Sequence, residues 1–451
     1  MNELSNVKDL NEVADLLEGR LKAMRLPMWD VFCMSFDIFE NQFRKTELEI
    51  TRHAVNFYYI IRTFYSSAEQ FGVGVVKANS LDLAQIDECI KKSQELARLN
   101  VTPRYELPQP GQSYPHVKLA EKKILADPEG VLTETSEEYL QLVQDFKRVE
   151  PTFGKLRIYI SARVLRNSEE LALDDQKTTF YIEFPLKAEE SGKLAEFWGI
   201  RYLKNSNQLD LENRLSKWAK LTIDSLHARP PPAAKSISAI FSPKMVWDAL
   251  SKTVGHHATG VALYEGISRF EKGARVAVDH FSLIDDGLME DGLFVANWDG
   301  EGNPQETTPI IKNGIFENFL YDQQYAALEE SKSTGNGLRS LDGDIINSIT
   351  NLEIRPGSYS LDELVESTNH GVFIEEFSWL NPSGVTGDFG AEIRNGYLIE
   401  NGKITAAIKG GNLSGNAFEM IKTIEGISKK QLVESKYKFP HIKFSGLILS
   451  S

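Results

Sequence analysis

Hydrophobic residues recur at helical spacing in several segments of the first half of the chain. Leu10, Val13, Leu17 and Leu21 lie three or four residues apart, which predicts an amphipathic helix over residues 8–24. Segments rich in β-branched and aromatic residues lie between such stretches and are typical of strands. The pattern therefore predicts further helices over residues 81–99, 133–149 and 211–227, and strands over residues 29–38, 46–52, 56–65, 155–165, 178–186 and 194–202.

The second half of the chain has a different pattern. It begins after Pro230-Pro231-Pro232, a run that cannot continue a helix and that stiffens a linker. A short strand over residues 235–241 and a helix over residues 243–263 follow, and short strands then dominate. Two further helices are predicted over residues 322–332 and 417–424. Asn-Gly pairs, a strong signal for hairpin turns, occur at Asn313-Gly314, Asn395-Gly396 and Asn401-Gly402.

These patterns predict an α+β protein with two domains, which also suits a length of 451 residues. We expect an N-terminal α/β domain with a mixed sheet over residues 1–232. We expect a C-terminal, mainly antiparallel β domain with a prominent N-terminal helix over residues 233–451.

The charge of the chain restricts its partners. The formal net charge is -14, and such a chain repels a phosphate backbone unless it carries a strong basic patch, which the sequence lacks. We therefore expect no nucleic-acid partner. No segment approaches the ~20 apolar residues of a membrane span, and residues 1–20 lack a signal-peptide pattern. Cys33 and Cys89 have no CxxC partner, so we expect buried thiols rather than a disulfide. Together these features lead us to expect no membrane association and a cytoplasmic location.

The most informative segment for chemistry is Gly-His-His-Ala-Thr-Gly-Val-Ala-Leu-Tyr-Glu-Gly at residues 255–266. A zinc peptidase needs two or three N, O or S ligands, an open position for water and a carboxylate as general base. This segment resembles the metal-binding helix of the TldD/PmbA family, whose metal-bearing members carry His-Glu-Ala-x-Gly-His-Ala-Leu-Glu-Gly. His256 falls on the first histidine of that pattern, His257 on the glutamate base and Val261 on the second histidine.

The resemblance implies that this chain lacks most of the family's metal site. Metal-bearing members also supply a cysteine near the C-terminus, whereas residues 431–451 contain none. We therefore assign no catalytic residue and no metal ligand, and His256 and His257 are vestigial candidates. Three interpretations remain open: two ordinary polar residues near a helix end, a metal site rebuilt with Glu265 or His280, or a metal-free role for His257 as an acid or hydrogen-bond donor.

Further segments carry the resemblance along residues 235–428. Their order and spacing match the family, and the missing glutamate and second histidine place the chain nearer the PmbA (TldE) branch than the TldD branch. These segments include Asp299-Gly300-Glu301-Gly302, Ser333-Thr334-Gly335-Asn336-Gly337, Ser383-Gly384-Val385-Thr386-Gly387-Asp388-Phe389 and Gly415-Asn416.

The resemblance also implies a strand-lined cleft that binds peptides, because an extended peptide can add to a free strand edge through main-chain hydrogen bonds. Two turns are candidates for lining this cleft, with the alternative that they only satisfy local turn geometry. Their residues are Thr334, Gly335, Asn336, Thr386, Gly387, Asp388 and Phe389. The nearby acidic run is expected to be a solvated loop, with a Mg or Ca site as the alternative; it comprises Asp285, Asp286, Asp299 and Glu301.

Three functions are open at this point. The first is the non-metal subunit of a TldD/TldE-type metallopeptidase acting on unfolded or leader peptides, with no cofactor in this chain and zinc in a metal-bearing TldD-like partner. The second is a self-sufficient metallopeptidase with a rebuilt metal site. The third is a non-enzymatic regulatory or binding protein. A heterodimer with the metal-bearing homologue and a homodimer are both compatible with the sequence.

Overall fold

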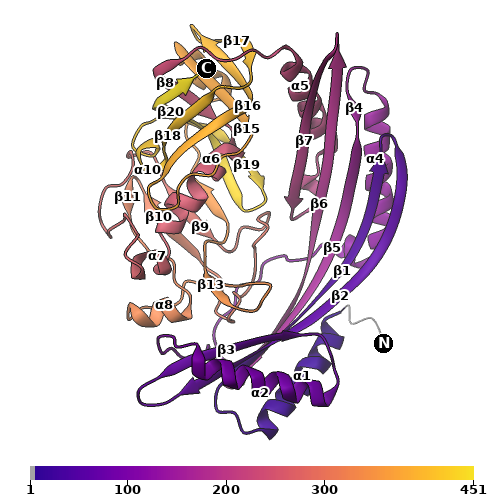
Figure 1. The fold of residues 1–451 in the computed structure, drawn as a ribbon, viewed down its shortest axis with the longest axis vertical. Helices are drawn as coiled ribbons and strands as arrows, with labels where there is room; N and C mark the ends of the chain where they lie inside the picture. The colour runs from indigo at the N-terminus through magenta and orange to yellow at the C-terminus, as the bar shows by residue number, and fades with distance from the viewer. Residues whose placement is uncertain (1–5) are drawn as a thin grey trace.

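A seven-stranded sheet forms the body of the first half of the protein, seen in a computed structural model that describes residues 6–451 (Figure 1). The strand order is β3-β2-β1-β5-β6-β4, and β7 pairs with β6. Every pairing in this sheet is antiparallel. Its strands are β1 (Trp29–Arg44), β2 (Glu47–Ser66), β3 (Phe71–Ala78), β4 (Glu150–Pro151), β5 (Phe153–Asn167), β6 (Ala172–Glu190) and β7 (Lys193–Leu203).

Two predictions for this sheet need correction. The strands expected over residues 46–52 and 56–65 are one strand, β2, which pairs with β1 from Glu47 to Thr63. Most residues of its first half are exposed, so backbone pairing extends the strand where no buried face marks it in the sequence. The mixed sheet expected in the first domain lies instead in the second.

Among residues 6–451, five α-helices accompany this sheet. α1 buries Leu10, Leu17 and Leu21, as its spacing predicts, and Asn6 caps its first turn by accepting from Asp9 N. α4 begins five residues before its predicted start, because Asp127 caps it and Pro128 fits its first turn. The helices are α1 (Val7–Ala23), α2 (Leu83–Leu99), α3 (Lys122–Ala126), α4 (Pro128–Gln144) and α5 (Leu211–His227).

An eleven-stranded sheet organises the second half. Its strands pair antiparallel except for β14 with β20 and β15 with β8, which are parallel. The α+β class and the two-domain architecture are therefore confirmed, while the bounds 1–232 and 233–451 stay a prediction. The strands are β8 (Ala234–Phe241), β9 (Leu283–Asp286), β10 (Thr307–Lys312), β11 (Ile315–Phe316), β14 (Leu352–Ile354), β15 (His370–Phe377), β16 (Asp388–Glu400), β17 (Lys403–Ile408), β18 (Asn412–Asn416), β19 (Ile424–Glu434) and β20 (Tyr437–Ser450). A separate two-stranded sheet joins β12 (Gly337–Arg339) to β13 (Ile345–Asn347).

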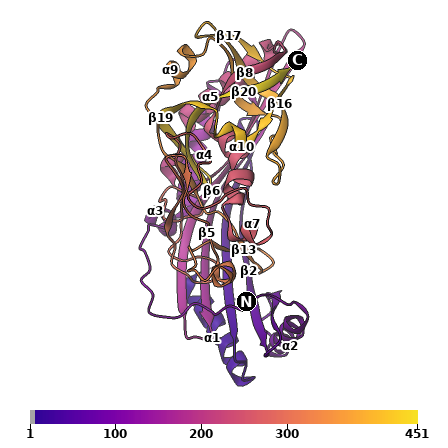
Figure 2. The ribbon, with the colours of Figure 1, turned by 90° about the vertical axis from the view of Figure 1, so that its left-hand side faces the viewer.

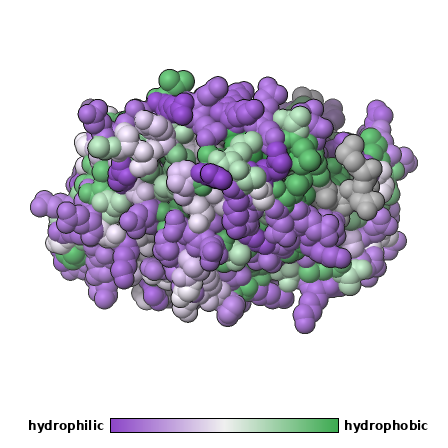
Figure 3. All heavy atoms as spheres, turned by 90° about the horizontal axis from the view of Figure 1, so that it is seen from below, coloured by the Kyte–Doolittle hydropathy of each residue, from purple (hydrophilic) through white to green (hydrophobic). Residues whose placement is uncertain are grey.

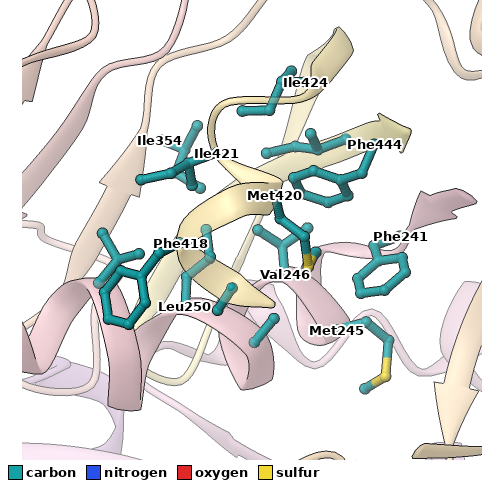
Figure 4. Close-up of a cluster of buried hydrophobic side chains, with 14 of the residues drawn as sticks. Phe241, Met245, Val246, Leu250, Ile354, Phe418, Met420, Ile421, Ile424 and Phe444 are labelled. Carbon is teal, nitrogen blue, oxygen red and sulfur yellow. The ribbon is translucent and has the colours of Figure 1, made fainter. Parts of the chain in front are cut away.

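Short helices close the core of the second half. Figure 4 shows the side chains of α10 gathered with those of α6 and with Phe241 and Phe444 of the sheet. Burial of this apolar cluster is the main force that holds α6 and α10 against the strands. The helices are α6 (Pro243–Leu250), α7 (Gly260–Tyr264), α8 (Gln323–Leu328), α9 (Leu361–Glu366) and α10 (Ala417–Met420).

The Asn-Gly signal is right at two of its three positions. Asn313 and Asn401 have positive φ, and the hairpins β10–β11 and β16–β17 turn there. Asn395 and Gly396 instead lie inside β16. Asn395 is buried there and its Nδ2 donates to Leu221 O of α5, 3.1 Å away. Asn395 therefore connects the two halves of the protein and does not form a turn.

The two halves pack against each other through apolar and charged contacts. In Figure 2 the second domain lies in front of the first sheet. Trp298 packs edge-on against Phe32 of β1, with ring centroids 6.4 Å apart. Asp30 of β1 lies 2.9 Å from Arg62 Nε and 3.1 Å from Arg339 Nη1. These three charged side chains are each at most 4% exposed, so the first sheet and β12 share a buried ion network.

The surface seen from below is mainly hydrophilic, with scattered hydrophobic patches (Figure 3). No helix among residues 6–451 is long and apolar enough to cross a membrane. Cys33 is buried and Cys89 half-buried, and neither is in a disulfide.

Candidate functional site

The segment expected as one metal helix is broken into three parts. α6 ends at Leu250, a π-helical turn follows over Ser251–Gly255, and α7 starts only at Gly260. The break lies at Thr259, whose backbone is extended and whose hydroxyl accepts from Ala262 N to cap α7. The prediction of a continuous helix over residues 243–263 is therefore wrong.

A distant strand-like segment imposes this break. Gly260 N donates to Leu320 O and Leu320 N donates to Ala258 O, both at 2.8 Å. The backbone of Leu320 thus replaces two hydrogen bonds that a continuous helix would make within itself. A Cβ on Gly260 would lie 2.6 Å from Tyr321 Cδ1 and 2.7 Å from Tyr325 Cβ, so glycine permits this close approach.

His257 is fully buried and both of its ring nitrogens are bonded. Nε2 donates to Gly384 O at 2.6 Å, and Nδ1 accepts from Arg269 N at 3.1 Å. The ring lies against Phe418, with centroids 4.6 Å apart. Burial lowers the pKa of His257, and the nearby charges of His256 and Arg269 lower it further against the opposing Gly384 bond. The ring is therefore neutral and joins three segments, with no free nitrogen for a metal or a substrate.

His256 points to a different environment. It lines a pocket of about 450 Å³ between the π-helical turn and the segment that follows β13. Lys252 and Lys436 contribute to the lining, although the Lys252 ammonium donates to Asn381 and the Lys436 ammonium lies over the Phe294 ring, and Trp247 supplies an aromatic side. The full lining is Trp247, Ser251, Lys252, His256, Thr259, Asn347, Ser348, Ile349 and Lys436.

Asn347 is the polar group in this pocket with spare bonding capacity. It is 5% exposed, its Oδ1 accepts from Val261 N at 3.0 Å, and its Nδ2 makes no hydrogen bond with the described residues. An unpaired buried amide N–H costs free energy unless a ligand or water accepts from it. Asn347 is thus a candidate donor to a bound molecule, and no sequence pattern points to it because it lies far from His256 along the chain.

The turn over residues 333–337 is internal. Thr334 Oγ1 donates to Asn336 Oδ1 at 2.6 Å, and Gly335 has a φ of +75°. Asn336 is 1% exposed, and its Nδ2 donates to Asp285 Oδ2 at 2.8 Å and to Ser348 O at 2.9 Å. Asn336 therefore supports the far side of the pocket through Ser348 and is closed to solvent, whereas Ser333 and Thr334 are half-buried.

The turn over residues 383–389 lies on the other side of His257. Its Gly384 carbonyl accepts the His257 bond, and Thr386 and Asp388 are exposed. Asn416 Nδ2 donates to Thr386 O at 2.8 Å and to Asp388 Oδ1 at 2.7 Å. Hydrogen bonding to Asn416 and Thr386 lowers the pKa of Asp388. Gly387 and Phe389 are buried beneath, so the turn presents one carboxylate beside Arg269.

The acidic run is not the solvated loop expected from the sequence. Asp285, Asp299 and Glu301 are each at most 5% exposed. Asp299 Oδ1 accepts from the backbone N–H groups of Glu301, Gly302 and Asn303, each at 2.9 Å. Burial raises the pKa of Asp285 to about 6, against hydrogen bonds from Asn336 and Thr350. These carboxylates thus organise buried loops.

The donor groups around His256 do not fit a catalytic zinc ion. Such an ion needs three protein ligands and an open position, whereas the pocket offers one imidazole, two lysines and no carboxylate or thiol. Among residues 6–451, no three His, Cys, Asp or Glu side chains are grouped so that they could hold a metal. Glu265 and His280, the residues considered for a rebuilt site, are both exposed.

Comparisons with known proteins agree on one family. A family model described as the PmbA/TldA metallopeptidase C-terminal domain matches residues 234–451. An uncharacterized protein of Methanocaldococcus jannaschii is 35% identical over 47% of this chain and 50% of its own length. A metalloprotease of the same organism is 30% identical over 45% of this chain and 46% of its own length. The matched part of the chain spans about half the length of these curated relatives.

The likeness in fold extends further than the likeness in sequence. The crystal structure of TldE from Thermococcus kodakarensis has a TM-score of 0.84 to this chain, covering 97% of this chain and 100% of that one at 19% identity. At that identity the match shows a common fold. Residues 234–451 therefore belong to the PmbA/TldD family of metallopeptidase-like proteins, and the chain as a whole has the fold of the solved TldE protein.

Proposed function

We propose that this chain is the non-metal subunit of a TldD/TldE-type peptidase and pairs with a metal-bearing homologue. The observation that carries the proposal is the state of the residues at the family's metal positions. His257 is neutral with both nitrogens bonded, and Val261 has no ligand atom. Zinc and the activated water belong, in this proposal, to the partner.

The pocket beside His256 is the proposed part of the peptide-binding cleft in this chain. Its volume of about 450 Å³ falls in the range of small-ligand pockets. Asn347 Nδ2 can donate to a peptide carbonyl, which would satisfy its missing hydrogen bond. Lys252 and Lys436 favour acidic side chains or a carboxylate in the bound peptide.

A free strand edge supports an extended peptide as the ligand. β13 pairs only with β12 among residues 6–451, which leaves its other edge without a strand partner. Asn347 ends β13 and lines the pocket, so a peptide added to this edge would pass His256. The exposed turn with Thr386 and Asp388 is proposed as a second contact, on the side of His257.

The relatives support the partnership. TldE is the name of the solved protein with the same fold, and other relatives are named metalloprotease TldD homologs, in Buchnera aphidicola for example. A cytoplasmic location is part of the proposal, and the two unpaired cysteines are in keeping with a reducing compartment.

Reconstitution tests the proposal. We expect no peptidase activity from the isolated chain on carboxymethylated casein, and activity when it is co-purified with a metal-bearing homologue from the same genome. Asn347→Ala is expected to raise the KM of the complex without breaking it. Asn207→Ala, an exposed asparagine remote from the pocket lining, is the matched control and should leave turnover unchanged.

Two results would reject the proposal. One is chelator-sensitive peptidase activity of the isolated chain, which would favour the self-sufficient metallopeptidase. The other is failure to form a complex with the homologue together with tight binding to an unrelated protein, which would favour a regulatory role.

A further inference from the structure

A second pocket lies where the two halves meet, away from His256. Its volume is about 300 Å³, at the lower end of ligand pockets. One wall comes from strands of the first sheet, including Arg163 of β5 and Lys177 of β6. The opposite wall comes from loops of the second half, residues 293–296, and from Arg339 of β12. A ligand here would touch both domains.

The charged groups of this pocket are mostly cationic. Arg163, Lys177 and Arg339 line it, against one carboxylate, Asp175. Both oxygens of Asp175 are already bound by Arg163, through Nε and Nη2, each at 2.7 Å. Asp175 is thus neutralised by Arg163, and Arg339 faces Asp30, so Lys177 supplies the remaining positive charge of the lining at a pH where it is protonated.

Several N–H donors in this lining lack acceptors. Arg163 Nη1 has no hydrogen-bond partner among residues 6–451, while Nη2 also donates to Trp298 O at 2.9 Å. Lys177 Nζ donates to Leu293 O and, at 3.1 Å, to Val295 O. One of its three N–H groups therefore remains available to a ligand. Arg339 is 97% buried, and its Nη2 makes no hydrogen bond with the described residues.

The positions of these cations are fixed by their surroundings. The Arg163 guanidinium lies 3.6 Å from the centroid of Trp298, and that of Arg339 lies 4.9 Å from the centroid of Phe32. Stacking of this kind holds a planar guanidinium in place at little further entropic cost on binding. The donors are therefore preorganised before a ligand arrives.

Most of the rest of the lining is apolar, apart from Ser161 and Thr179. Phe32, Met34, Tyr58, Phe294 and Leu338 contribute carbon surface around the cations. Such a wall offers nothing to a fully hydrated inorganic ion, but it stabilises a hydrocarbon or aromatic body. The pocket therefore favours a ligand with an anionic group at one end and an apolar body.

We propose that this interdomain pocket binds a small organic carboxylate, with the anion on Arg163 and Lys177 and the apolar body against Phe32 and Phe294. The site is separate from the peptide cleft proposed above and does not depend on it. Burial, together with the charge of Arg163, lowers the pKa of Lys177 to about 7. A bound anion would raise that pKa, so binding near pH 8 takes up a proton.

Calorimetric titration of the whole chain tests this site with three probes. 3-Phenylpropionate has the charge and the apolar body, 3-phenylpropionamide has the body alone, and acetate has the charge alone. We expect 3-phenylpropionate to bind at least about tenfold more tightly than the amide, which lacks the charge-assisted bond, and than acetate, which lacks the apolar contact. We also expect proton uptake at pH 8, seen as a dependence of the heat on the buffer.

Variants of the pocket locate the binding. Lys177→Met is expected to weaken 3-phenylpropionate at least about tenfold, and Lys177→Arg to retain most of the affinity and lose the proton uptake. Lys187→Met, on the same strand but outside the pocket lining, is the matched control and should bind as the wild type. If Lys177→Met does not fold, the Lys177→Arg result for proton uptake still decides the case.

One peptide probe, compared with 3-phenylpropionate, separates the two sources of the carboxylate. Ala-Ala-Ala-Phe with a free C-terminus binding more tightly than 3-phenylpropionate would assign the site to peptide C-termini, and weaker binding would assign it to free organic acids. Equal binding of the acid and the amide, or unchanged affinity in Lys177→Met, would overturn the proposal.

Discussion

Loss of the Glu434 carboxylate is expected to loosen the contact between the two halves of the protein. Glu434 ends β19, and its Oε2 lies 2.6 Å from Arg201 Nε of β7. Its Oε1 lies 2.5 Å from Arg214 Nη1 of α5. The Glu434 side chain is 4% exposed, and those of the two arginines are 16% and 10% exposed. Glu434→Gln keeps the shape of the side chain and removes the charge that both arginines face.

The size of the effect follows from the charge environment. Burial raises the pKa of Glu434, but the charges of Arg201 and Arg214 outweigh it and lower the pKa from 4.5 to about 2. That change corresponds to ~3 kcal/mol of preference for the charged form in the folded protein. Removing one member of a buried ion pair costs ~3–5 kcal/mol in other proteins. We therefore expect Glu434→Gln to lower the free energy of unfolding by ~3 kcal/mol.

Urea denaturation followed by tryptophan fluorescence measures this loss, because Trp218 of α5 lies beside both arginines. Glu419→Gln is the control. Glu419 is 64% exposed and, among residues 6–451, forms an ion pair only with Lys422, so loss of its charge should change the free energy of unfolding by less than ~1 kcal/mol. The native pKa lies below the unfolded one, so this stabilisation is present above pH 4.5 and disappears as the pH falls through 2. A Glu434→Gln protein as stable as the wild type at pH 7 would refute the reasoning.

Three further predictions concern stability. Burial raises the pKa of Asp285 to about 6, so the contribution of its protonated form to stability is full below pH 3.8 and is lost as the pH rises through 6. We expect the free energy of unfolding to fall by ~3 kcal/mol over that window in denaturation experiments, and the absence of this fall would contradict the burial argument. Gly260→Ala should destabilise the protein by ~1–3 kcal/mol because its Cβ meets Tyr321 and Tyr325, whereas Gly19→Ala in α1, where a Cβ has no atom within 4 Å, should stabilise it by ~1 kcal/mol. Equal melting temperatures of the two variants would rule this out. His257 has a lowered pKa, so stability should fall as the pH drops below 6.5, and His257→Gln should reduce that fall; an unchanged pH profile would show that the ring is not the cause.

The regular parts of the fold were accessible from local pattern. The ends of α1 lie within one residue of the periodic segment that predicts it, because its apolar face is buried along its whole length. β2 was predicted in two pieces because its exposed half has no buried face to mark it, and only pairing with β1 defines it. Local pattern thus predicts elements that bury a face, and it fails where a neighbouring strand alone fixes the backbone.

The candidate site depends on contacts that sequence spacing does not contain. The break at Thr259 comes from the backbone of Leu320, some sixty residues away along the chain. His256 and His257 are neighbours in sequence, yet one lines a pocket and the other is buried with both nitrogens bonded. Asn347 and Lys436 join His256 only because β13 and the start of β20 lie beside the π-helical turn. Their roles became visible only in three dimensions.

The metal content of the isolated chain tests the central claim most directly. The chain is purified without chelator in medium supplemented with zinc, and its zinc is measured by mass spectrometry beside that of the complex with its metal-bearing homologue. The account predicts far less than one zinc per isolated chain, one zinc per complex, and no change in either value with His256→Ala. One zinc per isolated chain that disappears with His256→Ala would contradict it.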